Sequence, residues 1–128
     1  MIPLKTPEEI QIMKEGGRRL ALVMKKTLAA IVPGVTLAEL DALADSEIEK
    51  QAGTPSFKTV PGYKWATCIN INQGVVHGIP NGYRIKEGDL VSVDLGMLYG
   101  GFHTDMAWTV AVGGQNEEFL KAGGKALE

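Results

Sequence analysis

Apolar side chains recur every three or four positions through the first part of the chain and predict a long helix. The helix is expected to begin at Thr6-Pro7-Glu8-Glu9, a capping box in which the threonine hydroxyl accepts a backbone N–H and the last glutamate reaches back. Pro33-Gly34 ends it. The pair Gly16-Gly17 costs roughly 1 kcal/mol per glycine relative to alanine, which predicts close packing at this point. The apolar positions of the helix are Ile10, Met13, Leu20, Met24, Leu28 and Ile31.

A second capping box, Thr36-Leu37-Ala38-Glu39, predicts a shorter helix that crosses the first or runs antiparallel to it. Leu40, Ala44 and Ile48 share one face of this helix and are expected to be buried. Gly53 is expected to cap its C-terminal end, because glycine adopts the left-handed conformation found there without steric cost.

After Pro55 the pattern changes to alternation of apolar and polar residues, which is typical of strands. A turn within Tyr99-Gly100-Gly101 separates the last two of them. A further helix with an acidic first turn starts near Asn116, and we expect the chain to be truncated within it. The predicted strands are Thr67–Asn72, Val75–His77, Leu90–Leu98 and Phe102–Val112.

Composition and charge narrow the class of protein. Apolar residues make up 45% of the chain and charged residues 22%, as in ordinary globular domains. The net charge of −2 argues against a nucleic-acid-binding surface, and no apolar run approaches the ~20 residues that span a bilayer. We therefore expect neither nucleic acid nor a membrane as a partner. The single cysteine, Cys68, forms no internal disulfide, and no apolar leader opens the sequence, so a cytoplasmic location is expected.

Each of the last two predicted strands carries one aspartate in an otherwise apolar stretch. With an even-numbered hairpin loop, Asp94 and Asp105 lie on the same face, directly opposite if Tyr99-Gly100 forms the turn and diagonal if Gly100-Gly101 does. Neighbouring carboxylates repel each other, and neither strand holds a lysine or arginine to compensate them. Three interpretations stay open: solvent-facing residues of an edge strand, an acid–base pair, or part of a divalent metal site.

Two histidines are further candidates. His77 precedes Gly78-Ile79-Pro80 and is either a hydrogen-bonded core or turn residue or a member of a site. His103 shares the strand face of Asp105 and is a metal ligand, a residue that orients one, or a surface side chain.

Taken together, these segments resemble the type I methionine aminopeptidases over essentially the whole chain. The combination of His-Gly-Ile-Pro with two later aspartates is much more specific than any single motif. The segments that carry the resemblance are Ile2–Ile10, Met13–Gly17, Cys68–Asn72, Val75–Pro80, Lys86–Asp94 and Gly101–Asp105.

The resemblance implies an α+β architecture that is half of a pita-bread (creatinase/aminopeptidase) fold, with two helices packed on an antiparallel sheet. It also implies that residues 1–128 are the N-terminal half of a catalytic domain. In the full-length protein, that domain would remove N-terminal methionine from nascent polypeptides by dinuclear-metal-assisted peptide hydrolysis.

The resemblance also implies roles for particular residues. Asp94 would bind one of two divalent ions (cobalt, manganese, iron or zinc), and Asp105 would bridge both. His77 would contact the substrate and the tetrahedral intermediate. The pocket for the methionine side chain would be lined by Tyr63, Cys68, Phe57 and Val60.

The remaining ligands of the family site lie in a second half that follows this segment in the complete enzymes. We therefore expect this chain alone to be inactive or nearly so, with the missing C-terminal half as its partner. One alternative is a homodimer of half-domains, in which a second copy completes an all-carboxylate metal site. The other is a non-catalytic binding module, although such a module has no reason to keep Asp94 and Asp105.

Overall fold

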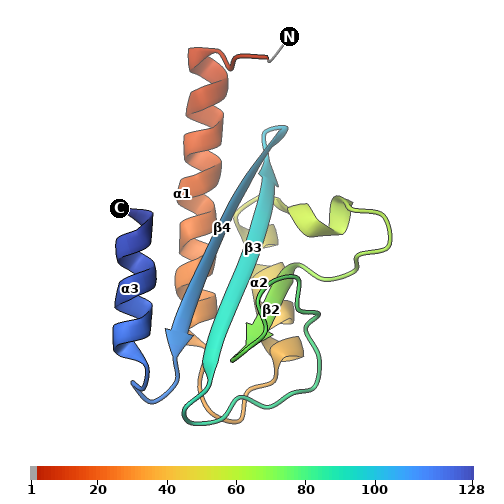
Figure 1. Ribbon diagram of the computed structural model, residues 1–128. Coiled ribbons are helices and arrows are strands. Elements are labelled where there is room, and N and C mark those ends of the chain that lie inside the picture. The colour runs from red at the N-terminus through yellow and green to blue at the C-terminus, as the bar shows by residue number, and fades with distance from the viewer. Residues whose placement is uncertain (1–2) are drawn as a thin grey trace.

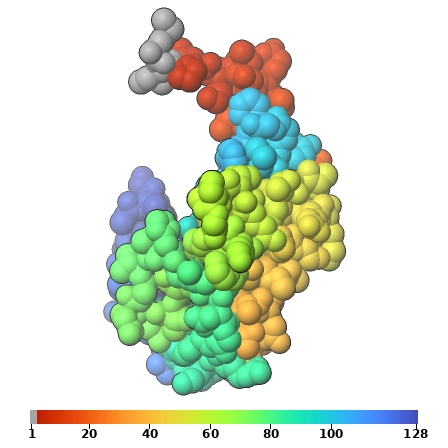
Figure 2. Space-filling view, turned by 90° about the vertical axis from the view of Figure 1, so that its right-hand side faces the viewer, coloured from red at the N-terminus to blue at the C-terminus, as the bar shows by residue number. Residues whose placement is uncertain are grey.

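A computed structural model describes residues 3–128 and shows an α+β architecture (Figure 1). The helices α1 (Pro7–Ala29) and α2 (Leu37–Lys50) lie together on one face of an antiparallel sheet, as predicted. The third helix, α3 (Glu117–Leu127), stands beside the free edge of the last strand. Figure 2 shows α3 on the opposite side of the molecule from α2. Ile2, where the resemblance begins, lies outside the described residues.

Both predicted capping boxes are present. The Thr6 hydroxyl accepts from the Glu9 N–H at 3.3 Å, and the Thr6 N–H donates to the Glu9 carboxylate at 2.7 Å. Thr36 and Glu39 make the same reciprocal pair at 3.2 Å and 2.7 Å. Each box satisfies N–H groups that a helix start leaves without partners, which is why both helices begin where the sequence predicts.

The prediction for the glycine pair in α1 is half right. A methyl group on Gly16 would lie 3.4 Å from side-chain atoms of Thr104 and Tyr99, so α1 does approach the sheet closely there. Gly17 has nothing within 4 Å of the same position.

The prediction for the end of α2 is wrong in its residue. Ala52, with φ +58°, adopts the left-handed conformation in place of Gly53. Gly53 is needed for a different reason: a Cβ atom there would overlap the sulfur of Met97. Close approach of the chain to the sheet, and not helix capping, selects this glycine.

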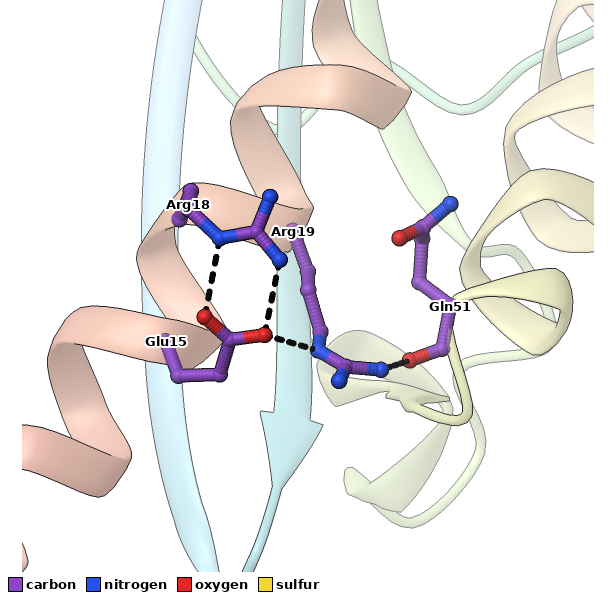
Figure 3. A network of polar contacts seen from close by, with 4 residues as sticks. All are labelled: Glu15, Arg18, Arg19 and Gln51. Atoms are coloured by element: carbon purple, nitrogen blue, oxygen red, sulfur yellow. Dashed lines mark hydrogen bonds and ion pairs between the residues drawn. The ribbon is translucent and has the colours of Figure 1, made fainter.

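Arg19 ties α1 to the end of α2 (Figure 3). Its guanidinium donates to Glu15 and to the backbone carbonyl of Gln51, each at 2.8 Å, and lies 4.5 Å from the centre of the Tyr99 ring. Arg18 donates to the same Glu15 carboxylate through two nitrogens. The network joins both helices to the end of the sheet at Tyr99, next to the hairpin turn.

The sheet is built around β3 (Leu90–Tyr99). On one side it pairs with β4 (Phe102–Ala111), and on the other with β2 (Thr67–Ile71) and the short β1 (Thr54–Pro55). The β3–β4 turn consists of Gly100 and Gly101 at φ +56° and +86°, the backbone of a type I′ hairpin. Of the two turns considered from sequence, the structure has the second.

The predicted strand Val75–His77 is wrong. Residues 72–89 form an irregular loop, in which Val75 and Val76 are exposed and His77 has φ +57°. A strand requires negative φ, and two adjacent valines alone do not establish alternation. The short β1 and the 3-10 turn η1 (Ser56–Thr59) after it were not predicted from the sequence.

Alternation along β3 separates the core from the site. Val91, Val93, Leu95 and Met97 are fully buried and join the helices in one hydrophobic core. Asp94 points to the opposite face, because successive strand residues alternate sides. The same alternation places Asp105 on that face of β4.

Candidate active site

A hollow on the face of the sheet away from α1 and α2 collects every residue to which the resemblance gives a site role. This site hollow has a volume of about 520 Å³. It is lined by Phe57, Val60, Tyr63, Cys68, His77, Asp94 and Asp105. These residues come from η1, the segment after it, β2, the 72–89 loop and the β3–β4 hairpin.

The two aspartates are diagonal neighbours on adjacent strands. Asp94 is opposite Ala107, and Asp105 is opposite Gly96. Gly96 makes room for the second carboxylate, because a Cβ atom there would lie 3.1 Å from Asp105 Oδ2 and 2.9 Å from the Ser56 Cβ. This function of Gly96 was not predicted from the sequence, although a glycine inside a strand is a known signal of close approach.

The environment of Asp94 disfavours its negative charge. Its Oδ1 atom is buried and has no hydrogen-bond partner. Burial raises the pKa of this carboxyl, and the neighbouring charge of Asp105 raises it further, while His77 opposes both effects. Asp105 is exposed overall, and partial desolvation of its carboxyl raises its pKa as well. An uncompensated oxygen beside a second carboxylate is the arrangement that a bound cation relieves.

The donors present fit part of a metal site. Carboxylate oxygens are suitable ligands for divalent ions. Across residues 3–128, no group of three or more His, Cys, Asp or Glu side chains is arranged to hold a metal ion. Asp94 and Asp105 are thus two carboxylates on one face that could contribute to a metal site, and within residues 3–128 no third such side chain joins them.

Tyr63 and Cys68 form one wall of the site hollow. The Tyr63 hydroxyl donates to the Thr67 carbonyl at 2.8 Å and lies 3.2 Å from the Cys68 sulfur. Burial, followed by the contact with Cys68, raises the pKa of Tyr63. Burial likewise raises the pKa of the Cys68 thiol. Both groups therefore stay neutral near pH 7. A neutral thiol is not a nucleophile, so Cys68 suits a wall that contacts an apolar side chain.

The aromatic rings around Tyr63 complete this wall. Phe57 meets Tyr63 edge to face at a centroid distance of 6.3 Å, and Trp65 does so at 5.3 Å. Edge-to-face pairs hold rings in defined orientations. The structure thus adds Trp65 as a support of the wall.

The two histidines have different surroundings. His77 faces the site hollow from the 72–89 loop, which is fixed beside it by a 2.9 Å hydrogen bond from the Ile69 N–H to the Gly78 carbonyl. His103 is not among the residues that line the hollow, and its Nδ1 lies 2.9 Å from the Ser56 hydroxyl. Of the interpretations considered for His103, the structure favours a surface strand residue with a hydrogen-bond partner.

The half pita-bread fold and the carboxylate pair define a class of metal-dependent peptidases, and the family comparison agrees. Residues 11–128 match the model of metallopeptidase family M24. The chain therefore belongs to this family. None of the helices within residues 3–128 combines the length and apolar character needed to cross a membrane.

Individual relatives are close in sequence and structure. The chain is 42% identical over 121 residues to methionine aminopeptidase 1 of Bacillus subtilis, covering 94% of this chain and 49% of the relative. The crystal structure of methionine aminopeptidase from Thermotoga maritima superposes with a TM-score of 0.92 at 40% identity, covering 99% of this chain and 53% of that one. The chain thus spans about half the length of the relatives that it matches.

The same fold also occurs in relatives of other specificity. Prolidase from Pyrococcus furiosus matches with a TM-score of 0.79 at 27% identity over 93% of this chain and 34% of that one. The architecture is therefore shared more widely than any one substrate preference.

Proposed function

We propose that residues 1–128 form the N-terminal half of a methionine aminopeptidase, which removes N-terminal methionine from polypeptides once a C-terminal half completes the site. The observation that carries this proposal is the buried, unpartnered Oδ1 of Asp94 beside Asp105 on one face of the sheet. The relatives with the same architecture and 40–42% identity are methionine aminopeptidases.

In the completed site, Asp94 and Asp105 would hold the divalent ions together with ligands from the C-terminal half. Such ions polarise a peptide carbonyl and acidify a bound water. The resemblance implies cobalt, manganese, iron or zinc as these ions.

The remaining residues of the site hollow would position the substrate. His77, which lines the hollow, would donate a hydrogen bond to the oxygen that becomes negative as the carbonyl is attacked. The methionine side chain would lie against the wall formed by Tyr63 and Cys68, with Phe57 and Val60 beside it. A thioether makes favourable contacts with aromatic rings and with a polarisable thiol.

The decisive experiment is a chimera in which this chain replaces the matching half of the Bacillus subtilis enzyme. We expect the chimera with Mn²⁺ or Co²⁺ to release methionine from a Met-Ala-Ser peptide. Asp94→Ala and Asp105→Ala should abolish the release, and the exposed Glu49→Gln should not. A folded chimera that binds metal without hydrolysing the peptide would contradict the proposed function.

A second experiment addresses the chain by itself. Calorimetric titration with Mn²⁺ should show weak binding that Asp94→Asn reduces at least about tenfold. We expect little or no hydrolysis by the isolated chain. Binding together with sedimentation as a dimer would favour the homodimer of half-domains, whereas absence of binding both alone and in the chimera would favour the non-catalytic module.

A further inference from the structure

A buried carboxylate behind the site hollow anchors the wall that Tyr63 and Cys68 form. Asp41, on α2, is only 9% exposed. Its Oδ1 accepts three hydrogen bonds: from the Ala66 N–H at 3.0 Å, the Thr67 N–H at 2.9 Å and the Thr67 hydroxyl at 2.7 Å. Bonds to a carboxylate are roughly twice as strong as bonds between neutral groups. The start of β2 is therefore held firmly against α2.

The anchored residue is the one on which the wall is built. The Thr67 carbonyl accepts from the Tyr63 hydroxyl at 2.8 Å, and the next residue along the strand is Cys68. The Tyr63 hydroxyl also lies 3.2 Å from the Cys68 sulfur. Thr67 is thus bonded to Asp41 through its N–H and hydroxyl and to Tyr63 through its carbonyl, so it connects α2 to the wall.

A weaker tie from the same helix holds η1, which carries the Phe57 ring of the same wall. Asp45, one turn after Asp41, pairs with Lys58 of η1, which is next to Phe57. The side chains of this pair are 28% and 35% exposed, so the ion pair contributes less than the buried bonds of Asp41. The wall is therefore fixed to α2 at two points, with Asp41 as the stronger tie.

We propose that Asp41 is a positioning residue that sets the width of the site hollow, and thereby which N-terminal side chain fits it. The hydrogen bonds of Asp41 go to Ala66 and Thr67, neither of which lines the hollow, so Asp41 acts on the wall through Thr67. The inference deepens the proposed function and rests on it for the identity of the side chain. The position of the wall, by contrast, can be measured without any catalysis.

Cys68 reports the position of the wall, because it is the only cysteine in the chain and is 5% exposed. Labelling by a small maleimide should be about tenfold faster in Asp41→Ala, since loss of the anchor lets the start of β2 open locally. Thr67→Val removes one of the three bonds and should give a smaller acceleration, and it serves if Asp41→Ala does not fold.

Asp89→Asn is the matched control. Asp89 is 6% exposed, and its carboxylate also accepts three hydrogen bonds, from Asn72, Tyr83 and Lys86, but it does not contact the wall. At equal global stability, set by added urea, Asp89→Asn should leave the labelling rate unchanged. Equal rates in the Asp41 and Asp89 variants would overturn the proposal, because Cys68 would then respond only to global unfolding.

The chimera then tests specificity. Asp41→Ala should raise KM for Met-Ala-Ser several-fold while kcat changes by less than about twofold, and it should weaken the preference for methionine over norleucine. Faster labelling with unaltered KM and preference would overturn the specificity role. If the unsubstituted chimera is inactive while Asp41→Ala still accelerates labelling, the proposed function fails but the anchoring of the wall stands.

Discussion

Replacing Asp94 by asparagine should make the metal-free chain more stable, although most substitutions in a sheet destabilise. The ionised carboxylate has a buried oxygen without a partner and a second carboxylate diagonally across the hairpin. Diagonal side chains lie about 7–8 Å apart, and at an effective dielectric constant of 20–40 their repulsion is roughly 1–2 kcal/mol. Partial exposure reduces this, so we expect a gain of about 1 kcal/mol at pH 7, or roughly 3–5 °C in Tm.

The pH dependence gives the effect a sign that can be checked. The folded-state pKa of Asp94 is raised above its unfolded value, so its favourable contribution is complete below about pH 4 and is lost as pH rises through the folded pKa. The advantage of Asp94→Asn should therefore shrink as pH falls toward 4. Thermal unfolding in EDTA, followed by circular dichroism between pH 4 and 8, measures it.

Asp89→Asn is the matched control for this experiment. Hydrogen bonds from the Lys86 N–H, Asn72 and Tyr83 lower the pKa of Asp89 despite its burial. Asp89→Asn should therefore lower Tm at pH 7, opposite in sign to Asp94→Asn. Added Mn²⁺ should stabilise the unsubstituted chain and not Asp94→Asn. If Asp94→Asn is less stable than the unsubstituted chain in EDTA at pH 7, the assignment of Asp94 as an uncompensated carboxylate is wrong.

Three further substitutions test the geometry around the site. Gly78→Ala places a Cβ atom in steric conflict with the Ile69 carbonyl oxygen. This substitution should speed hydrogen exchange of the Ile69 amide and lower the free energy of unfolding by about 1–3 kcal/mol. Unchanged exchange would contradict the close contact. Gly96→Ala crowds Asp105 and should weaken Mn²⁺ binding in calorimetry several-fold, with preserved affinity as the contrary result. Thr36→Ala removes the N-cap of α2 and should lower the free energy of unfolding in urea by about 1 kcal/mol. Mn²⁺ affinity should stay unchanged, and a loss of affinity would contradict a purely local role of this cap.

The helices and the central hairpin could be predicted because their signals are local. A capping box involves residues three positions apart, and the shared face of Asp94 and Asp105 follows from alternation and an even-numbered turn. The choice of Gly100 and Gly101 for that turn required the structure, because adjacent glycines allow either register.

The features that could not be predicted depend on contacts between distant segments. A Cβ atom on Gly53 would overlap the Met97 side chain, and one on Gly78 would overlap the Ile69 carbonyl. Met97 and Ile69 are both distant in sequence from the glycines that they constrain. The loop conformation of His77 depends on the same contact, so the two valines before it indicated a strand that does not form. The grouping of Phe57 and Val60 with the aspartates was expected from resemblance alone, since no periodicity in the sequence relates η1 to β4.

The placement of Asp94 and Asp105 on one hairpin also bears on how the proposed site can be assembled. Asp94 and Asp105 are linked by the continuous β3–β4 ladder, so the register of this hairpin sets their diagonal relationship. The hairpin is held by pairing of β3 with β1 and β2 and by the core beneath it, all within this chain. Under the proposed function, the pair would keep its geometry until the remaining ligands are supplied by a separate polypeptide, which makes this half a suitable component for split-enzyme reporters reconstituted from two independently produced fragments.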